Sequence, residues 1–292
     1  MRLLSIVASF LLVSAASAQQ KKVPTKAVEL LSEDTAAYRA APVGFDKPNE
    51  TMLHGTVDSV WYESKTVGTK RQMMVYTPPG YDLEFKYPVL YLLHGIGGDD
   101  KEWLDQGAAA TILDNLYTEK KLVPMIVVMP NGRAMKNDSA VGNMMDSVKV
   151  KAFATFEADL LDDVIPYIES NYHILQSKEN RAIAGLSMGG GQALNFGLLH
   201  PETFGWIGGF SPAPNTKKPE ELFIRPKEAA SNIKLLWISC GDKDPLISTV
   251  QGLHKTLKLN NVRHVYHIDK GGHEFSVWKN DLYIFSRMLF RK

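Results

Sequence analysis

The chain has 292 residues, of which 45% are hydrophobic, and its 33 basic residues nearly balance its 32 acidic ones. This length and composition can form one large α/β core, and no linker rich in Gly, Ser or Pro divides the chain. The near-neutral charge argues against binding to nucleic acid or to an anionic membrane surface, which both require a clustered basic excess.

The first 18 residues follow the order of a secretory signal. Arg2 is followed by an apolar run from Leu3 to Val13, and small residues then lead to Ala18. The run is shorter than the roughly 20 apolar residues of a membrane anchor. We therefore expect cleavage after Ala18 and an exported protein with no membrane attachment, located in the periplasm or outside the cell.

Two regions follow the signal. Residues 19–50 are polar and contain three prolines, so we expect a loosely attached leader with a short helix across Lys26–Ala40. Residues 51–292 are expected to form the main folded domain. The only cysteine, Cys240, excludes an intrachain disulfide, and its place at the end of an apolar run indicates a buried residue.

The domain begins with strand patterns and continues as alternating strands and helices. Thr56–Glu63 and Arg71–Thr77 alternate in polarity and predict an antiparallel pair. Continuous apolar runs predict parallel strands buried on both faces at Val89–Leu93, Met125–Met129, Ala182–Leu186, Trp206–Phe210, Leu235–Cys240 and His264–Ile268. Helices are predicted at Ala108–Lys120, Phe156–Tyr172, Gly191–Leu199 and Leu246–Leu259. This order predicts a three-layer α/β fold with a mostly parallel sheet.

The loop after Ala182–Leu186 contains a candidate nucleophile. Its sequence Gly185-Leu186-Ser187-Met188-Gly189 has the form Gly-x-Ser-x-Gly, which places a serine on a sharp strand-to-helix turn. The pattern occurs by chance in about one chain in ten of this length, and a plain glycine-rich turn is the alternative. The assignment of Ser187 therefore depends on partner residues.

A base and an acid occur in later loops. Among the eight histidines, His273 alone lies in a glycine-rich loop directly after the last predicted strand. Asp244 lies in the turn after Leu235–Cys240, far enough from the strand end to reach toward His273, and Asp242 in the same turn is the alternative. The order Ser187, Asp244, His273 is that of the α/β-hydrolase solution to nucleophilic catalysis.

Acyl transfer also requires N–H donors for the oxyanion. The Met188 N–H follows the nucleophile, and the glycine-rich loop after Val89–Leu93 can supply the Ile96 N–H, with Gly95 or Gly97 as alternatives. Besides Ile96, the residues whose loop positions suit a substrate pocket are Gly95, Gly97, Trp103, Phe210 and Trp278. Trp103 and Trp278 fit core or lid packing equally well. No compact metal-ligand spacing occurs, so no metal is expected.

Several segments together resemble one family. They are Tyr91-Leu92-Leu93-His94-Gly95-Ile96-Gly97-Gly98, Pro130-Asn131-Gly132, the Ser187 elbow, Phe210-Ser211-Pro212-Ala213-Pro214-Asn215 and Gly271-Gly272-His273-Glu274-Phe275-Ser276-Val277-Trp278. From about Gly44 to the C-terminus the chain resembles the carbohydrate esterases that include bacterial feruloyl esterases and esterase D-like enzymes. The resemblance implies an α/β-hydrolase fold, a Ser187–His273–Asp244 triad, and Ile96 and Met188 as oxyanion donors. It also implies hydrolysis of hydroxycinnamate esters on xylan without a cofactor.

Other acyl groups remain open within this class. Acetylxylan, siderophore esters and lipid acyl esters are the alternatives, because the sequence does not define the pocket. A binding protein that keeps the hydrolase fold is the non-enzyme alternative, and the presence of all three triad candidates argues against it. The expected partner is an ester-bearing polysaccharide or oligosaccharide, and no oligomeric state is predicted.

Overall fold

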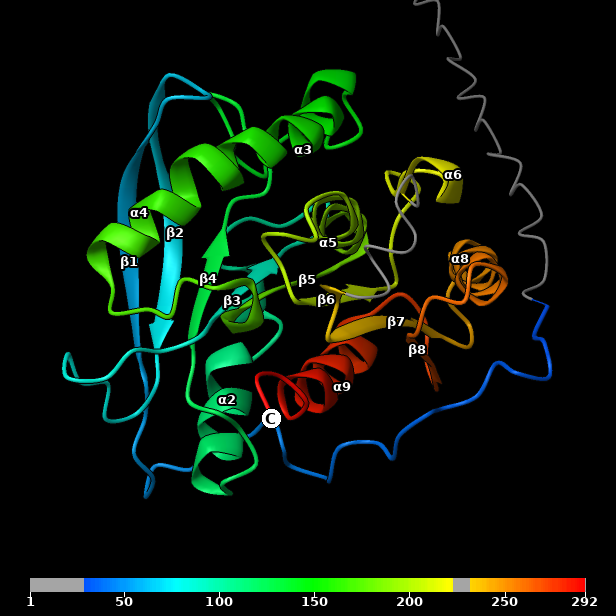
Figure 1. The fold of residues 1–292 in the computed structure, drawn as a ribbon, viewed down its shortest axis with the longest axis horizontal. Helices are drawn as coiled ribbons and strands as arrows, with labels where there is room; N and C mark the ends of the chain where they lie inside the picture. The colour runs from blue at the N-terminus through cyan, green and yellow to red at the C-terminus, as the bar shows by residue number, and fades with distance from the viewer. Residues whose placement is uncertain (1–28, 223–231, 292) are drawn as a thin grey trace, which may run out of the picture.

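The sheet of this protein has eight strands, and six of them form a parallel core. The computed structural model describes residues 29–222 and 232–291, so the predicted signal at residues 1–18 lies outside the described residues. The strand order is β1-β2-β4-β3-β5-β6-β7-β8 (Figure 1). Their bounds are β1 Thr56–Ser64, β2 Thr69–Thr77, β3 Val89–Leu93, β4 Ile126–Pro130, β5 Arg181–Leu186, β6 Trp206–Phe210, β7 Leu235–Gly241 and β8 Val265–Asp269. β1 and β2 are antiparallel, β2 pairs antiparallel with β4, and the remaining strands are parallel.

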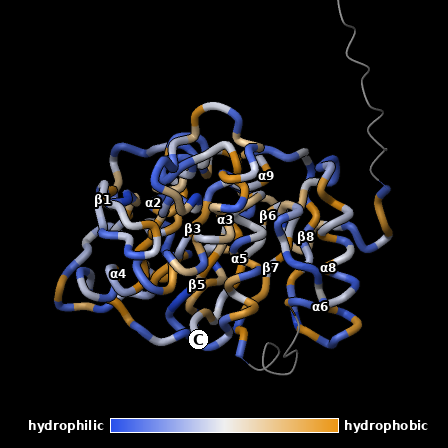
Figure 2. Tube along the Cα trace, turned by 90° about the horizontal axis from the view of Figure 1, so that it is seen from above, coloured by the Kyte–Doolittle hydropathy of each residue, from blue (hydrophilic) through white to orange (hydrophobic). Residues whose placement is uncertain are grey.

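Helices cover both faces of this sheet. Their bounds are α1 Glu102–Asp105, α2 Ala109–Thr118, α3 Ser147–Asp159, α4 Ile165–Asn171, α5 Ser187–Leu199, α6 Pro219–Leu222, α8 Ile247–Leu259 and α9 Phe275–Ser286, and a π-helical turn, η1 (Leu160–Val164), joins α3 to α4. In Figure 1, α5 and α8 lie above β6 and β7, and α9 lies below them. Two large apolar clusters correspond to the two faces, one packed by α5 and α8 and the other by α2 and α9. The hydrophobic stretches accordingly lie inside the fold (Figure 2). The predicted α/β-hydrolase class with a mostly parallel sheet is confirmed.

Two helices differ from the sequence prediction. α3 begins at Ser147, well before the predicted start at Phe156, and the Asp146 carboxylate caps it by accepting the Val148 N–H at 2.8 Å. The segment Ser147–Lys151 alternates polar and apolar residues as a strand does, which hides the start of the helix. α9 was not predicted, because most of its side chains are buried and it has no continuous polar face.

The expected leader makes specific contacts with the domain where it is described, although most of its residues are exposed, and the helix predicted across Lys26–Ala40 is wrong for its described part. Residues 29–40 contain no helix. The Thr35 carbonyl accepts the Ile268 N–H at 3.0 Å, and the Ala37 N–H donates to His267 Nδ1 at 3.0 Å. Tyr38 stacks on Trp237 with 5.7 Å between ring centroids. The segment therefore pairs with the outer edge of β8, and the blue trace in Figure 1 then runs on toward α2.

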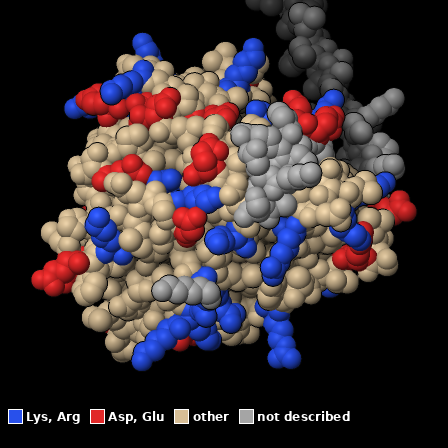
Figure 3. Space-filling model, viewed as in Figure 1, with Lys and Arg blue, Asp and Glu red and all other residues tan. Residues whose placement is uncertain are grey.

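Acidic and basic side chains are mixed over the surface seen in Figure 3. Along the described ranges, no helix has the length and apolar character needed to cross a membrane. The candidate site lies at the carboxyl ends of β3, β5, β7 and β8, where ligands bind in open parallel sheets.

Candidate active site

Ser187 occupies a strained turn between β5 and α5. Its φ is +50°, in the left-handed region that non-glycine residues rarely adopt. The turn needs glycines on both sides, because a Cβ on Gly185 would lie 2.6 Å from the Gly189 backbone and a Cβ on Gly189 would lie 2.5 Å from the His94 carbonyl oxygen. Strand β5 therefore delivers Ser187 to the first position of α5, where the helix dipole favours negative charge.

Three side chains from separate loops form one hydrogen-bonded chain. Ser187 Oγ lies 3.0 Å from His273 Nε2, and His273 Nδ1 lies 2.8 Å from an Asp244 carboxylate oxygen. Asp244 is fully buried and its other oxygen accepts the Leu246 N–H at 2.8 Å. Burial raises the pKa of Asp244, but the hydrogen bonds from His273 and Leu246 outweigh it, so the pKa is below its usual value. Asp244 is thus held ionised beside the imidazole, as a triad acid must be.

Asp242, the alternative acid, has a different position. Its carboxylate accepts the Gly271 N–H at 3.0 Å and pairs with Lys270 Nζ at 2.8 Å. The Lys270 hydrogen bond lowers the pKa of Asp242 against a smaller opposing effect of burial. Asp242 therefore anchors the loop that carries His273, and the geometry favours Asp244 as the partner of the imidazole.

A close backbone approach fixes the His273 loop to the Asp244 turn. A Cβ on Gly241 would lie 2.4 Å from the Gly271 carbonyl oxygen, and the Lys243 N–H donates to that same oxygen at 2.8 Å. On its other side, the His273 ring packs edge-to-face on Trp278, with centroids 4.8 Å apart. The Trp278 indole N–H in turn donates to Ser211 Oγ at 3.1 Å. The imidazole is therefore held from both sides.

Hydrogen bonds from side chains to its carbonyl groups hold the oxyanion loop Gly95–Gly98 in place. Burial lowers the pKa of His94 to about 4, so the ring is neutral. Its Nε2 accepts the Gly132 N–H at 2.8 Å, which leaves the Nδ1 proton to bond the Gly95 carbonyl at 2.6 Å. Since the C=O and N–H of a trans peptide point in opposite directions, this bond orients the Ile96 N–H away from His94. Among the described residues, neither the Ile96 N–H nor the Met188 N–H has a hydrogen-bond acceptor.

Arg133 holds the next part of the same loop. Its guanidinium is fully buried and donates to the carbonyls of Ile96 and Gly98 at 2.8 and 3.0 Å. The guanidinium also lies over the Phe153 ring, 5.4 Å from its centroid. Sequence reasoning did not assign roles to His94 and Arg133, although both lie in loops after strands that were predicted to carry function.

The predicted pocket residues have mixed positions. Trp103 and Phe210 are fully buried in the core beneath the site, where their rings meet edge-to-face, so their expected place on a substrate pocket is wrong. Trp278 is buried too and supports His273. Gly95 packs beside Ser187, whereas a Cβ on Gly97 would meet open space. Loop position could not reveal which way these side chains point.

A small apolar cluster takes the place of those aromatic residues at the site. Phe153, Met188 and Ala213 are buried, and the partly buried Ile96, Val150 and Leu246 pack against them. Met188 directly follows the nucleophile and Ile96 belongs to the oxyanion loop, so this cluster adjoins Ser187. Within the described ranges, no group of three or more His, Cys, Asp and Glu side chains could hold a metal ion.

Comparison with known proteins identifies the family. Residues 64–286 match the protein family described as "Putative esterase". The chain belongs to this esterase family. It is a carboxylic-ester hydrolase with the α/β-hydrolase fold, as the sequence resemblance predicted.

The similar members of the family include feruloyl and acetyl esterases. The chain is 36% identical over 247 residues to an endo-1,4-beta-xylanase/feruloyl esterase of Xylanibacter ruminicola, covering 82% of this chain and 32% of that protein. It thus spans about a third of that relative. An acetyl esterase of Caldicellulosiruptor saccharolyticus is 26% identical over 65% of this chain and 78% of its own length. The solved ferulic acid esterase AmCE1/Fae1A of Anaeromyces mucronatus, in complex with ferulic acid, has a TM-score of 0.78 and 28% identity over 86% of this chain and 96% of that one.

Proposed function

We propose that this esterase cleaves carboxylic esters through Ser187, His273 and Asp244, and that its substrate is a hydroxycinnamoyl ester of xylan. The observation that carries the mechanism is the hydrogen-bonded chain from Ser187 through His273 to Asp244. The feruloyl assignment is supported by the xylanase/feruloyl esterase relative and by the ferulic acid esterase of similar structure.

The geometry supports a two-step reaction. His273 Nε2 takes the proton from Ser187 Oγ as the oxygen attacks the ester carbonyl, and Asp244 stabilises the imidazolium. The N–H groups of Met188 and Ile96 stabilise the oxyanion, and the alcohol leaves with the proton from His273. Water, activated by the same imidazole, then cleaves the acyl-enzyme and restores Ser187.

The apolar cluster beside Ser187 is proposed to receive the acyl group. Ile96, Val150 and Leu246 are its partly exposed members, and such a surface suits an aromatic acid better than a charged one. An acetyl group is the second candidate, because the chain matches an acetyl esterase over 78% of that relative's length. Export after cleavage at Ala18 is proposed from the order of residues 1–18 alone.

The catalytic assignment is tested by replacing Ser187 with Ala. We expect loss of methyl ferulate hydrolysis by at least about three orders of magnitude, because the nucleophile is removed. Labelling with a fluorophosphonate should reach one equivalent in the native protein and vanish in the Ser187→Ala variant. Activity that persists in this variant would refute the role of Ser187.

The acyl group is tested with three esters compared at equal enzyme concentration. They are methyl ferulate, 4-nitrophenyl acetate and acetylated xylan. Rapid hydrolysis of methyl ferulate supports the feruloyl assignment. Cleavage of acetylated xylan with no reaction of methyl ferulate would replace it with the acetyl assignment.

A further inference from the structure

A small cavity lies beside the oxyanion loop. It has a volume of about 140 Å³ and is bounded on one side by Asp99 and Asp100, which directly follow Gly98. Trp61 and Gln72 of the β1–β2 hairpin also line it. Asn131 also lines it and contacts His94, which holds the Gly95 carbonyl. The cavity and the oxyanion loop therefore share a wall.

Asp100 lines this cavity and has a buried carboxylate oxygen without a hydrogen-bond partner among the described residues. Its side chain is only 8% exposed, and its Oδ2 has no partner among the residues that the structure describes. Buried carboxylate oxygens without a partner are uncommon, because their desolvation is not compensated. Burial and the neighbouring Asp99 raise the pKa of Asp100 to about 6. Because protein atoms cover Oδ2 itself, a ligand hydroxyl in this cavity would meet the remaining part of the Asp100 side chain, which lines it.

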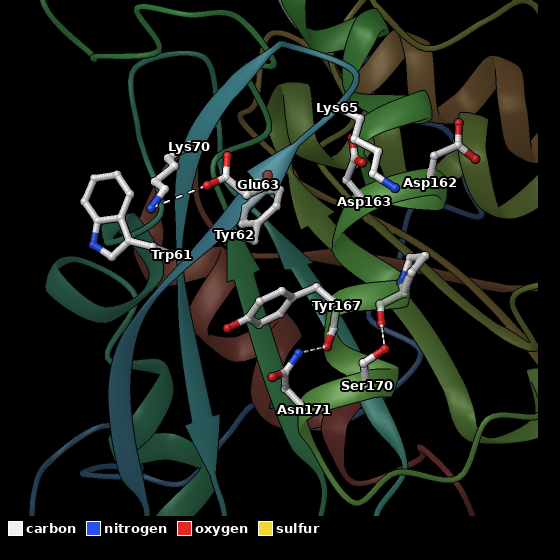
Figure 4. Close-up of a pocket in the computed structure, with 11 residues that line it drawn as sticks. Trp61, Tyr62, Glu63, Lys65, Lys70, Asp162, Asp163, Tyr167, Ser170 and Asn171 are labelled. Carbon is white, nitrogen blue, oxygen red and sulfur yellow. Dashed lines mark hydrogen bonds and ion pairs between the residues drawn. The ribbon is translucent and has the colours of Figure 1, made fainter.

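Trp61 joins this cavity to a larger one. It stands on the edge strand β1 with 58% of its surface exposed, although large aromatic side chains are usually covered. It also borders a cavity of about 490 Å³ between the hairpin and α4, whose other walls include Tyr167, Ser170 and Asn171. Figure 4 shows Trp61 beside Lys70 at the outer side of the hairpin, with the α4 residues on the other side. The two cavities thus share Trp61 and Lys70 in their linings.

We propose that these two cavities form a track for the sugar chain of the substrate, in which Asp100 accepts a sugar hydroxyl and Trp61 stacks on a sugar ring. The proposal rests on the proposed function, because it takes the alcohol of the ester to be a polysaccharide. The flat face of an indole suits the apolar face of a pyranose, and the surrounding polar groups suit its hydroxyls. A nucleic acid fits less well, because three acidic residues, Asp99, Asp100 and Asp138, outnumber the basic Lys70 and Arg71 in the lining of the smaller cavity.

The track is tested first by binding without catalysis. Xylohexaose is titrated into the Ser187→Ala protein by calorimetry, and the titration is repeated with Trp61→Ala or Asp100→Ala added. We expect each addition to weaken binding about tenfold, which corresponds to the loss of one good contact. Phe85→Ala is the matched control, since Phe85 is 62% exposed and lines neither cavity, and it should leave the affinity unchanged. Absence of binding, or equal affinity in all variants, would refute the track.

Kinetics separate the track from the catalytic proposal. In the active protein, Trp61→Ala and Asp100→Ala should raise the KM for a feruloylated xylo-oligosaccharide about tenfold relative to the KM for methyl ferulate. Asp100→Asn keeps one acceptor oxygen and should recover part of this loss. If xylohexaose binds through Trp61 and Asp100 but no ester is cleaved, the proposed function fails and the track stands. If both esters are cleaved and the KM ratio does not change, the track fails alone.

Discussion

At the residue scale, the site depends on buried polar groups that hold the oxyanion loop in place. His94 and Arg133 bond the carbonyls of Gly95, Ile96 and Gly98, and none of these bonds needs the substrate. The loop is therefore preorganised, which is the condition under which N–H donors stabilise an oxyanion well. The two side chains act through the loop and are positioning residues.

Replacing Arg133 with Lys tests this positioning. Arg133 Nη2 donates to the carbonyls of Ile96 and Gly98 while Nη1 donates to the Asp138 carbonyl at 2.7 Å. A single ammonium group on a shorter side chain cannot replace all three bonds, so the Ile96 N–H would lose part of its fixed orientation. We expect kcat for methyl ferulate to fall about 10- to 100-fold with little change in KM, since the oxyanion exists only in the transition state. The exposed Arg263→Lys change is the control. A raised KM with unchanged kcat would contradict the assignment.

A second prediction at this scale concerns the stability cost of Asp100. Its pKa of about 6 lies above the usual value of 3.8, so between these pH values the folded protein binds more protons than the unfolded chain. Stability from this residue is therefore present at low pH and is lost as the pH rises through about 6. Asp100→Asn should then raise the free energy of unfolding at pH 7 by on the order of 2 kcal/mol and change it little at pH 4.

Denaturant unfolding of both proteins at the two pH values measures this difference. A variant that is less stable at pH 7 would mean that the Asp100 carboxylate has a stabilising partner. Since Asn keeps the shape of Asp, packing changes contribute little to the comparison.

The sequence predicted the catalytic residues but not the side chains that surround them. Ser187, Asp244 and His273 could be selected because chain order and strand-end position limit which loops can meet, and the structure brings these three together. The direction of Trp103 and Phe210 depends on the packing of α1 and β6 into the core, which has no local sequence signal. Their places near Ser187 are taken by side chains such as Phe153 and Leu246, which come from distant segments.

At the scale of elements, parallel strands were predicted better than the helices around them. Short apolar runs bounded by Gly or Pro have few alternatives, so the predicted Val89–Leu93 coincides with β3 and Trp206–Phe210 with β6. Helix α3 alternates like a strand in its first turns, and α9 is buried on nearly every side. In both helices tertiary packing decides the conformation, and the 3.6-residue pattern is weak.

The loop after β7 and the loop after β8 touch through Gly241, and a substitution there tests how this contact positions His273. Gly241→Ala places a methyl group against the carbonyl oxygens of Gly271 and Gly272, at 2.4 and 2.6 Å, and backbone must move to relieve the clash. We expect His273 to shift away from Ser187 and kcat to fall about 100-fold, because small misplacement of a catalytic group is costly. Assays with methyl ferulate measure the loss.

Gly252→Ala is the matched control for this change. Gly252 lies in α8, and a Cβ there would meet nothing within 4 Å. Alanine should keep full activity and raise stability by about 0.5–1 kcal/mol, since it favours the helix. Full activity in Gly241→Ala would show that the two loops can separate without disturbing His273.

At the scale of the whole molecule, the segment before β1 completes the fold. It covers the outer edge of β8 through Thr35 and Ala37, and further along the Asn115 side chain of α2 donates to the Phe45 carbonyl at 2.7 Å. Phe45 also meets Tyr283 of α9 edge-to-face at 5.3 Å. Most of these partners, such as His267 for Ala37, lie 230 or more residues away in the chain. The polar composition of the segment suggested a loose leader. Its contacts are with residues far along the chain, so no local sequence pattern could have shown them.

Removal of this segment should weaken the whole domain. A chain that begins at Thr51 would expose the edge of β8 and one face of Trp237, and unpaired edges also promote aggregation. We expect the Tm to fall by about 5 °C or more relative to a chain that begins at Gln19, since about 2–4 °C corresponds to 1 kcal/mol in a domain of this size. Tyr38→Ala in the longer chain should produce part of this loss, whereas Leu31→Ala, a change at a similarly exposed side chain (47% against 40%), should produce almost none. Thermal unfolding followed by circular dichroism measures all four proteins, and equal Tm values for the two chain lengths would show that the segment rests on the domain without stabilising it.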